Sequence, residues 1–175
     1  RNINIAGNEV HNLKLGSSEA IAVNGNVDGF RITGNKVHDN DNIGIDVIGF
    51  EGVGRAGIDR ARNGIISGNT VYNIDSKSNP AYRGDRSAAG IYVDGGSDIV
   101  IENNTIKNSN YGIELASEHQ GKNTSRIQVR RNLVEGSHIA GISLGGGSTS
   151  NGGVNDSIIE NNDFRNNSRP LWRQN

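Results

Sequence analysis

The amino-acid sequence predicts an all-β solenoid, a single-stranded parallel β-helix of about six coils. Three observations support this prediction: a recurring asparagine motif, a recurring Gly-Ile motif downstream of it, and a composition rich in turn-forming glycine and asparagine. A repeat of this length cannot bury its own apolar face. Stacking of successive repeats would bury a continuous core.

The asparagine motif has the form apolar-x-x-Asn-x-apolar, and its copies recur 27 to 35 residues apart. They read IAGNEV, ITGNKV, ISGNTV, IENNTI, VRRNLV and IENNDF, with asparagines at Asn8, Asn35, Asn69, Asn104, Asn132 and Asn162. Asparagine tolerates left-handed backbone geometry, and its amide can bond to the backbone and to the asparagine one coil above. We therefore expect a structural asparagine column at one bend, without a catalytic role.

The second motif is Gly-Ile-x-apolar, which reads as a short strand because its apolar residues alternate with period 2. Its copies are AIAV (20–23), GIDV (44–47), GIYV (90–93), GIEL (112–115) and GISL (141–144), with PLW (170–172) as a degenerate last copy. The residues expected to point into the core are Ile45, Val47, Ile91, Val93, Ile113, Leu115, Ile142 and Leu144.

Length and charge limit the other possibilities. The 175 residues suit one domain, 1–175, and the net charge of −1 gives no electrostatic case for nucleic acid. No apolar run is long enough to span a bilayer, so no membrane insertion is expected. The chain begins with Arg1 and contains no Met. We therefore expect a fragment of a longer β-helix, and its oligomeric state stays open.

The Gly-Ile strands should form one sheet whose outward residues fall into two columns. The residues between the apolar positions are Ala22, Asp46, Tyr92, Glu114 and Ser143, and those after them are Asn24, Ile48, Asp94, Ala116 and Gly145. Insertions at 49–62, 76–89 and 116–125 flank these strands and would wall a groove. From strand spacings, the Cα atoms of Asp94 and Glu114 are expected roughly 8 Å apart.

The two repeats resemble those of the right-handed parallel β-helix proteins of the pectate-lyase-like superfold, and the resemblance covers essentially the whole chain. GIYVD followed one coil later by GIEL is also similar to β-helical glycoside hydrolases. That likeness implies Asp94 and Glu114 as the acid and nucleophile pair. The companion histidine of those motifs is displaced here, since His119 lies five residues beyond Glu114.

These observations favour a secreted, periplasmic or cell-surface enzyme that hydrolyses a polysaccharide or oligosaccharide with paired carboxylates. The catalytic candidates are Asp94, Glu114 and Asp46. The substrate-binding candidates, which come from the outward columns and the groove walls, are Tyr92, Arg86, Glu118, His119 and Lys122. Hydrolysis of this kind needs no cofactor.

Two alternatives stay open. A calcium-dependent pectate- or alginate-like lyase would need acidic ligands, and DNDNIGID (39–46) resembles the calcium loop of some pectate lyases, which gives Asp39, Asp41 and Asp46 as candidates. However, neither outward column contains Lys or Arg as the base. A non-catalytic carbohydrate-binding or structural β-helix, like a tailspike or adhesin, would use the same groove without turnover.

Overall fold

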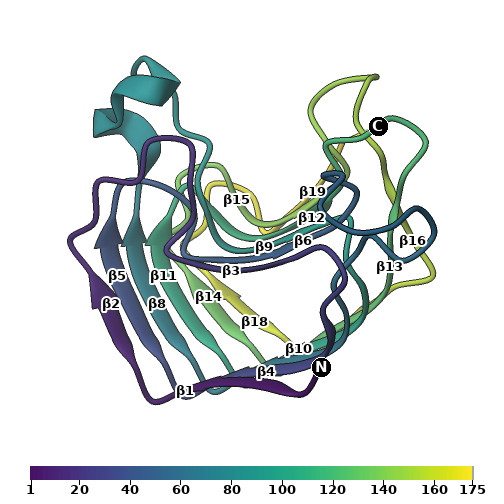
Figure 1. Cartoon of the computed structure of the whole chain (residues 1–175). Coiled ribbons are helices and arrows are strands. Elements are labelled where there is room, and N and C mark those ends of the chain that lie inside the picture. Colours follow the sequence, from purple (N-terminus) through teal and green to yellow (C-terminus); the bar gives the residue numbers. More distant parts are fainter. Residues whose placement is uncertain (175) are drawn as a thin grey trace.

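The computed structural model describes residues 1–174, which wind into six stacked coils that build three parallel sheets (Figure 1). The first sheet contains β1 (Ile3–Ala6), β4 (Asp28–Thr33), β7 (Arg62–Ser67), β10 (Ser97–Glu102), β13 (Thr124–Arg130), β16 (Val154–Asn155) and β17 (Ile158–Glu160). The second contains β2 (Glu9–His11), β5 (Lys36–Asn40), β8 (Thr70–Ile74), β11 (Thr105–Ser109), β14 (Leu133–Glu135) and β18 (Asp163–Arg165). The third contains β3 (Ile21–Asn24), β6 (Ile45–Ile48), β9 (Ala89–Asp94), β12 (Tyr111–Ala116), β15 (Ala140–Leu144) and β19 (Leu171–Arg173).

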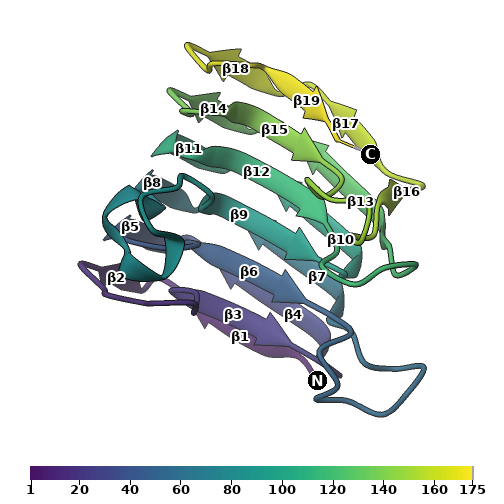
Figure 2. The ribbon, with the colours of Figure 1, turned by 90° about the horizontal axis from the view of Figure 1, so that it is seen from above.

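The strands of the third sheet follow one another in chain order across the molecule (Figure 2). Their register aligns the Gly-Ile motifs as the sequence predicted, because Ile45 pairs with Ile91, Ile91 with Ile113 and Ile113 with Ile142. Leu171 continues this row beyond Ile142, so the degenerate last copy is a true strand.

The core lies inside the coils and consists mainly of isoleucine and valine. The predicted inward residues are fully buried, except that Leu144 is half-buried and packs against the core.

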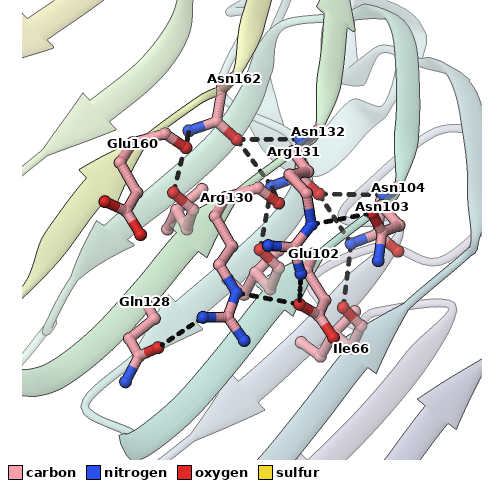
Figure 3. A network of polar contacts seen from close by, with 12 residues as sticks. Ile66, Glu102, Asn103, Asn104, Gln128, Arg130, Arg131, Asn132, Glu160 and Asn162 are labelled. Atoms are coloured by element: carbon pink, nitrogen blue, oxygen red, sulfur yellow. Dashed lines mark hydrogen bonds and ion pairs between the residues drawn. The ribbon is translucent and has the colours of Figure 1, made fainter.

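The asparagine column forms a continuous hydrogen-bonded ladder at the bend between the first and second sheets (Figure 3). The Oδ1 atom of Asn104 accepts bonds of 2.9 Å from both the backbone N–H and the side-chain amide of Asn69. The Nδ2 atom of Asn104 donates in turn to Ile66 O and to Asn132 Oδ1. The structural role predicted for these residues is confirmed.

The left-handed geometry falls one residue earlier than expected. The residues with positive φ are those immediately before the ladder asparagines: Gly7, Gly34, Gly68, Asn103, Arg131 and Asn161. The reversal at that preceding residue leaves the ladder asparagine with ordinary φ. Its amide can then point along the stack.

The insertions lie on opposite sides of the third sheet, as the sequence predicted (Figure 1). One side carries the 3₁₀ turns η1 (Ser76–Ser78) and η2 (Pro80–Tyr82), and the other carries loops 49–61, 117–123 and 145–153. Within residues 1–174, no helix is long and apolar enough to cross a membrane.

Candidate functional site

An open groove of about 240 Å³ lies over the third sheet, between the two walls. Its lining is mainly polar and comprises Ser17, Glu19, Asn24, Ile43, Asp46, Ile48, Glu51, Tyr82, Asp94 and Glu118. Half of these residues carry a carboxylate, and within the described residues 1–174 none of the lining residues is Lys, Arg or His. The groove is therefore strongly acidic in a chain of nearly balanced charge.

The strand register places the predicted carboxylates on the outward face of the third sheet, where Asp46 and Asp94 line the groove. Asp46 pairs with Tyr92, Tyr92 pairs with Glu114, and Asp94 pairs with Ala116 on the next coil. This register matches the predicted columns. With coils about 4.8 Å apart and residues about 3.3 Å apart along a strand, it separates the Cα atoms of Asp94 and Glu114 by roughly 8 Å.

Asp94 ends strand β9 and is only 4% exposed. Its Oδ1 atom accepts a hydrogen bond of 2.8 Å from the backbone N–H of Glu118, which ties the floor to loop 117–123. Burial raises the pKa of Asp94 to about 7; the Glu118 N–H opposes this rise, and the nearby carboxylates of Glu118 and Glu51 add to it.

Glu114 stands on the outward face of the third sheet beside an apolar cluster and is not among the residues that line the groove. Tyr92 is packed here with Ala89 and Ala116, and Tyr111 lies against the same cluster. This setting desolvates the carboxyl group, and together with the charge of Asp94 it raises the pKa of Glu114 to about 8. At neutral pH, Glu114 is therefore suited to carry a proton.

Asp46 is the most deeply buried acid of the floor, with 2% exposure. Its Oδ1 atom is buried and has no hydrogen-bond partner. Desolvation, followed by the charges of Asp94 and Glu19, raises the pKa of Asp46 well above its usual range. A buried, unpartnered carboxylate oxygen is costly, which distinguishes Asp46 from the fully bonded ladder asparagines.

Three carboxylates converge at the wall of the groove. Glu51, Asp94 and Glu118 each offer an oxygen within 4.8 Å of the others. The loop that carries Glu51 is closed by Asp59, whose carboxylate accepts bonds from Gly52 N (2.6 Å) and Gly54 N (2.7 Å). His119, from the facing loop, lies 2.9 Å from Glu51 Oε1 through its Nε2 atom.

Glu51 and Glu19 were not among the site residues predicted from the sequence. Glu51 lies in the 49–62 insertion that was predicted to be a wall, and Glu19 immediately precedes the first strand of the third sheet. An acidic residue in a wall insertion was the available signal for Glu51. Its meeting with Glu118 depends on the folding of two loops, which the repeat pattern does not specify.

The remaining substrate-binding candidates lie in different places. Tyr92 is only 7% exposed, so little of its ring is free to stack on a sugar. Lys122 lies beside the wall, with Nζ 5.7 Å from the centroid of the Phe50 ring. Arg86 points to the corner between sheets, where its Nε atom lies 3.3 Å from Asp75.

The structure does not assemble Asp39, Asp41 and Asp46 into one calcium loop. Asp39 bonds to His38 Nδ1 (2.6 Å), and Asp41 accepts a bond from the backbone N–H of Leu15 (2.8 Å). These two aspartates line a separate depression, whereas Asp46 faces the acidic groove. Within residues 1–174, the carboxylate group that converges closely enough for a cation is instead Glu51, Asp94 and Glu118.

Comparisons with known proteins agree with this architecture. The family model described as "Right handed beta helix region" matches residues 1–167. The uncharacterized protein YwoF of Bacillus subtilis (strain 168) is 47% identical over 169 residues, which are 96% of this chain and 36% of that protein. The chain therefore spans about a third of this relative's length.

Two solved structures share the fold. The periplasmic alginate epimerase AlgG superimposes with a TM-score of 0.59 and 16% identity, covering 97% of this chain and 38% of that one. An alginate lyase from Paenibacillus sp. str. FPU-7 superimposes with a TM-score of 0.62 and 16% identity, covering 94% and 51%. At this identity, the likeness shows the fold alone.

Proposed function

The chain belongs to the right-handed β-helix family, and we propose that its acidic groove processes a polysaccharide by hydrolysis of a glycosidic bond. One observation carries the proposal: Asp94 and Glu114 stand on successive coils, on the outward face of the third sheet, with Asp94 lining the groove. The roughly 8 Å between their Cα atoms leaves room for side-chain separations of either hydrolytic geometry, about 5–5.5 Å for retention and 6.5–9.5 Å for inversion.

The two carboxyl groups would take different roles. Glu114, with the higher pKa of about 8, donates its proton to the glycosidic oxygen as that bond breaks. Asp94, with a pKa of about 7, either attacks the anomeric carbon or removes a proton from the attacking water. Asp46 lies one coil beyond Tyr92, and its raised pKa would let it hold a proton beside the pair.

Aromatic rings beside Glu114 support a sugar-binding role. Trp172 pairs in register with Ser143, which pairs with Glu114, so Trp172 continues the same outward column. Its ring stacks with Tyr111 at 6.3 Å between centroids. Such rings can pack against the apolar faces of sugars, so this end of the sheet would extend the binding surface.

A second candidate function is supported by the convergence of Glu51, Asp94 and Glu118. A divalent cation held there could neutralise the carboxylate of a uronate sugar, as a lyase or epimerase requires. The two structural neighbours described above are an alginate epimerase and an alginate lyase. The base for proton abstraction would have to come from outside the groove lining, and Lys122, which lies over the Phe50 ring in the wall, is a candidate.

The proposal includes a location outside the cytoplasm, as for the periplasmic AlgG. A carbohydrate-binding role without turnover is the remaining alternative. It predicts affinity for a glycan that survives Asp94→Asn, and no product.

The test is a screen of neutral and uronate polysaccharides with wild type, Asp94→Asn and the matched control Glu160→Gln, with and without EDTA. Glu160 is an exposed acid on the first sheet, away from the groove. If the chain is a hydrolase, reducing ends are released equally with and without EDTA. This release is lost in Asp94→Asn and kept in Glu160→Gln. Formation of unsaturated products that absorb in the ultraviolet, abolished by EDTA, would show a lyase and overturn the hydrolase proposal. Binding of a glycan without any product would overturn both enzyme proposals in favour of a carbohydrate-binding module.

A further inference from the structure

The wall of the groove brings three carboxylates together, with His119 beside one of them at 2.9 Å from Glu51. Glu51 and Glu118 are exposed, Asp94 is buried, and one oxygen of each lies within 4.8 Å of the others. Glu19 and Asp46 line the same 240 Å³ space. Like charges this close repel one another, so a bound cation would stabilise the arrangement.

Asp46 gives an independent indication of a ligand. Its side chain is 2% exposed and lines the groove, and its Oδ1 atom has no hydrogen-bond partner. Buried polar atoms in folded proteins nearly always have a partner, so an unpartnered oxygen facing an acidic space calls for a missing donor or ion. Ordinary surface acids do not share this feature, because water satisfies their oxygens.

We propose that the groove binds a calcium ion between Glu51, Asp94 and Glu118, with the carboxylate of Asp46 facing the same space. Calcium accepts six to eight oxygen ligands in flexible geometry. The groove supplies only oxygen ligands, from one strand and two loops. Magnesium demands a more regular octahedron and gives up its water less readily. Zinc favours His and Cys, and the chain has no Cys.

The surroundings hold the three ligands in place. Asp59 closes the Glu51 loop through the N–H groups of Gly52 and Gly54. Arg60 braces the facing loop by donating to Gly96 O (2.7 Å) and Asn123 O (3.0 Å). His119 contacts Glu51 at 2.9 Å and would remain as the group that orients this ligand.

This site rests on the second candidate function, whose divalent cation it identifies as calcium, and it does not depend on the hydrolytic proposal. With calcium bound, Asp94 is a ligand and the cation-dependent chemistry on uronate sugars applies. Without calcium, Asp94 is free to act with Glu114. Calcium binding is measured without any sugar, so the cation site and the hydrolytic activity can each fail alone.

The experiment is calorimetric titration of calcium chloride into the chain after treatment with EDTA and dialysis. One site with a Kd of roughly 10⁻⁴–10⁻³ M is expected, the range of extracellular calcium modules. Glu51→Gln and Glu118→Gln should each weaken binding about tenfold or more, because calcium affinity follows the number of charged ligands. Both side chains are exposed, so neither change should disturb folding. Glu160→Gln, an exposed acid outside the groove, should bind as wild type.

Thermal unfolding supplies a second readout. Calcium should raise the Tm of wild type and of Glu160→Gln, and should raise that of the two groove variants less. Magnesium at the same concentration should have a smaller effect. The site is overturned if wild type gives neither heat nor a Tm shift at about 10 mM calcium, well above the expected Kd. It is also overturned if both groove variants bind calcium as tightly as wild type.

Discussion

Two columns of polar residues run along this β-helix, and they differ in how their polar atoms are satisfied. At the bend after the first sheet, each buried asparagine bonds to the next and to the backbone, as Asn69 does with Asn104 and Ile32. Over the third sheet, Asp46 has a buried oxygen without a partner, and Asp94 and Glu114 have raised pKa values.

This difference in hydrogen bonding distinguishes the structural asparagine column from the acidic column of the candidate site. A polar column that satisfies itself contributes to stability, because every buried donor and acceptor has a partner. A column that leaves its charges uncompensated costs stability, and such strain is expected where a ligand is bound or a proton is transferred. Both columns repeat on successive coils, so periodicity alone does not tell them apart.

The largest expected effect is on turnover. Glu114→Gln keeps the shape of the side chain but removes the proton that the leaving oxygen needs. We expect hydrolysis to fall about 10²- to 10⁴-fold, the range for a general acid. Release of reducing ends from the substrate found in the screen measures the fall.

Glu160→Gln, which removes a carboxylate from the exposed face of the first sheet, should keep full activity. Activity of Glu114→Gln within a factor of a few of wild type would remove Glu114 from the mechanism. The groove would then act through other acids.

The next effect is on stability and tests the satisfied column. Asn104→Ala removes the acceptor of both Asn69 bonds and the donor to Ile66 O and Asn132. Leaving buried groups unpaired costs about 1–3 kcal/mol each, so we expect a loss of about 3 kcal/mol or more in the free energy of unfolding. Urea denaturation measures it.

Asn8→Ala is the matched control, because Asn8 begins the ladder and is exposed. Its side chain donates to Ala6 O and Asn35 Oδ1, at the solvent-facing end of the stack. A loss of about 1 kcal/mol or less is expected there. Equal losses for Asn104→Ala and Asn8→Ala would mean that a buried position of the ladder contributes no more to stability than its exposed end.

The scaffold was predictable from the sequence because it repeats. Six asparagines at a fixed offset identified the ladder, and the Gly-Ile motifs gave the register of the third sheet, including the last strand at Leu171. The floor of the groove followed from the same register, which placed Asp46, Asp94 and Glu114 on one face.

For the walls of the groove, the sequence predicted where the insertions lie but not how their loops fold. Loop conformation does not repeat, so the meeting of Glu51 with Glu118 and the hydrogen bond from Glu118 N to Asp94 could not be read from spacing. Burial of the floor was also missed: Tyr92 was expected to be accessible, but it packs with Ala89 and Ala116. That packing produces the raised pKa of Glu114.

The strain of the acidic column should appear as a dependence of stability on pH. Asp94 and Glu114 have folded pKa values of about 7 and 8, above the ordinary values of 3.8 and 4.5. For an acid with a raised folded pKa, the stabilising contribution is present below the unfolded pKa and is lost as the pH rises through the folded pKa. In EDTA, we therefore expect Tm to fall from pH 5 to pH 9.

The size of the fall follows from two conversions. One pKa unit corresponds to about 1.4 kcal/mol, and about 1 kcal/mol moves Tm by about 2–4 °C in a domain of this size. Between pH 5 and pH 9, the approach to pKa values of about 7 and 8 spans about 2 and 3 pKa units, or about 3 and 4 kcal/mol. With the Glu114 part halved for screening, about 5 kcal/mol remains, so a fall of about 10–20 °C is expected. Glu114→Gln should flatten the slope. The raised pKa of His38, caused mainly by Asp39, contributes with the same sign in both proteins, so their difference isolates the groove. Parallel slopes would show that Glu114 ionises freely.

The smallest effect is expected at Arg86, whose sequence context suggested a contact with substrate. Its guanidinium pairs with Asp75 at 3.3 Å, with both side chains about a third exposed, and it is not part of the groove lining. Partly exposed pairs contribute about 0–1 kcal/mol, so Arg86→Ala should change the free energy of unfolding by less than about 0.5 kcal/mol. It should also leave KM and kcat unchanged, because no lining side chain depends on it. A rise in KM without loss of stability would show that the wall at 76–88 reaches the substrate. The binding surface would then extend beyond the acidic groove to the corner between the second and third sheets.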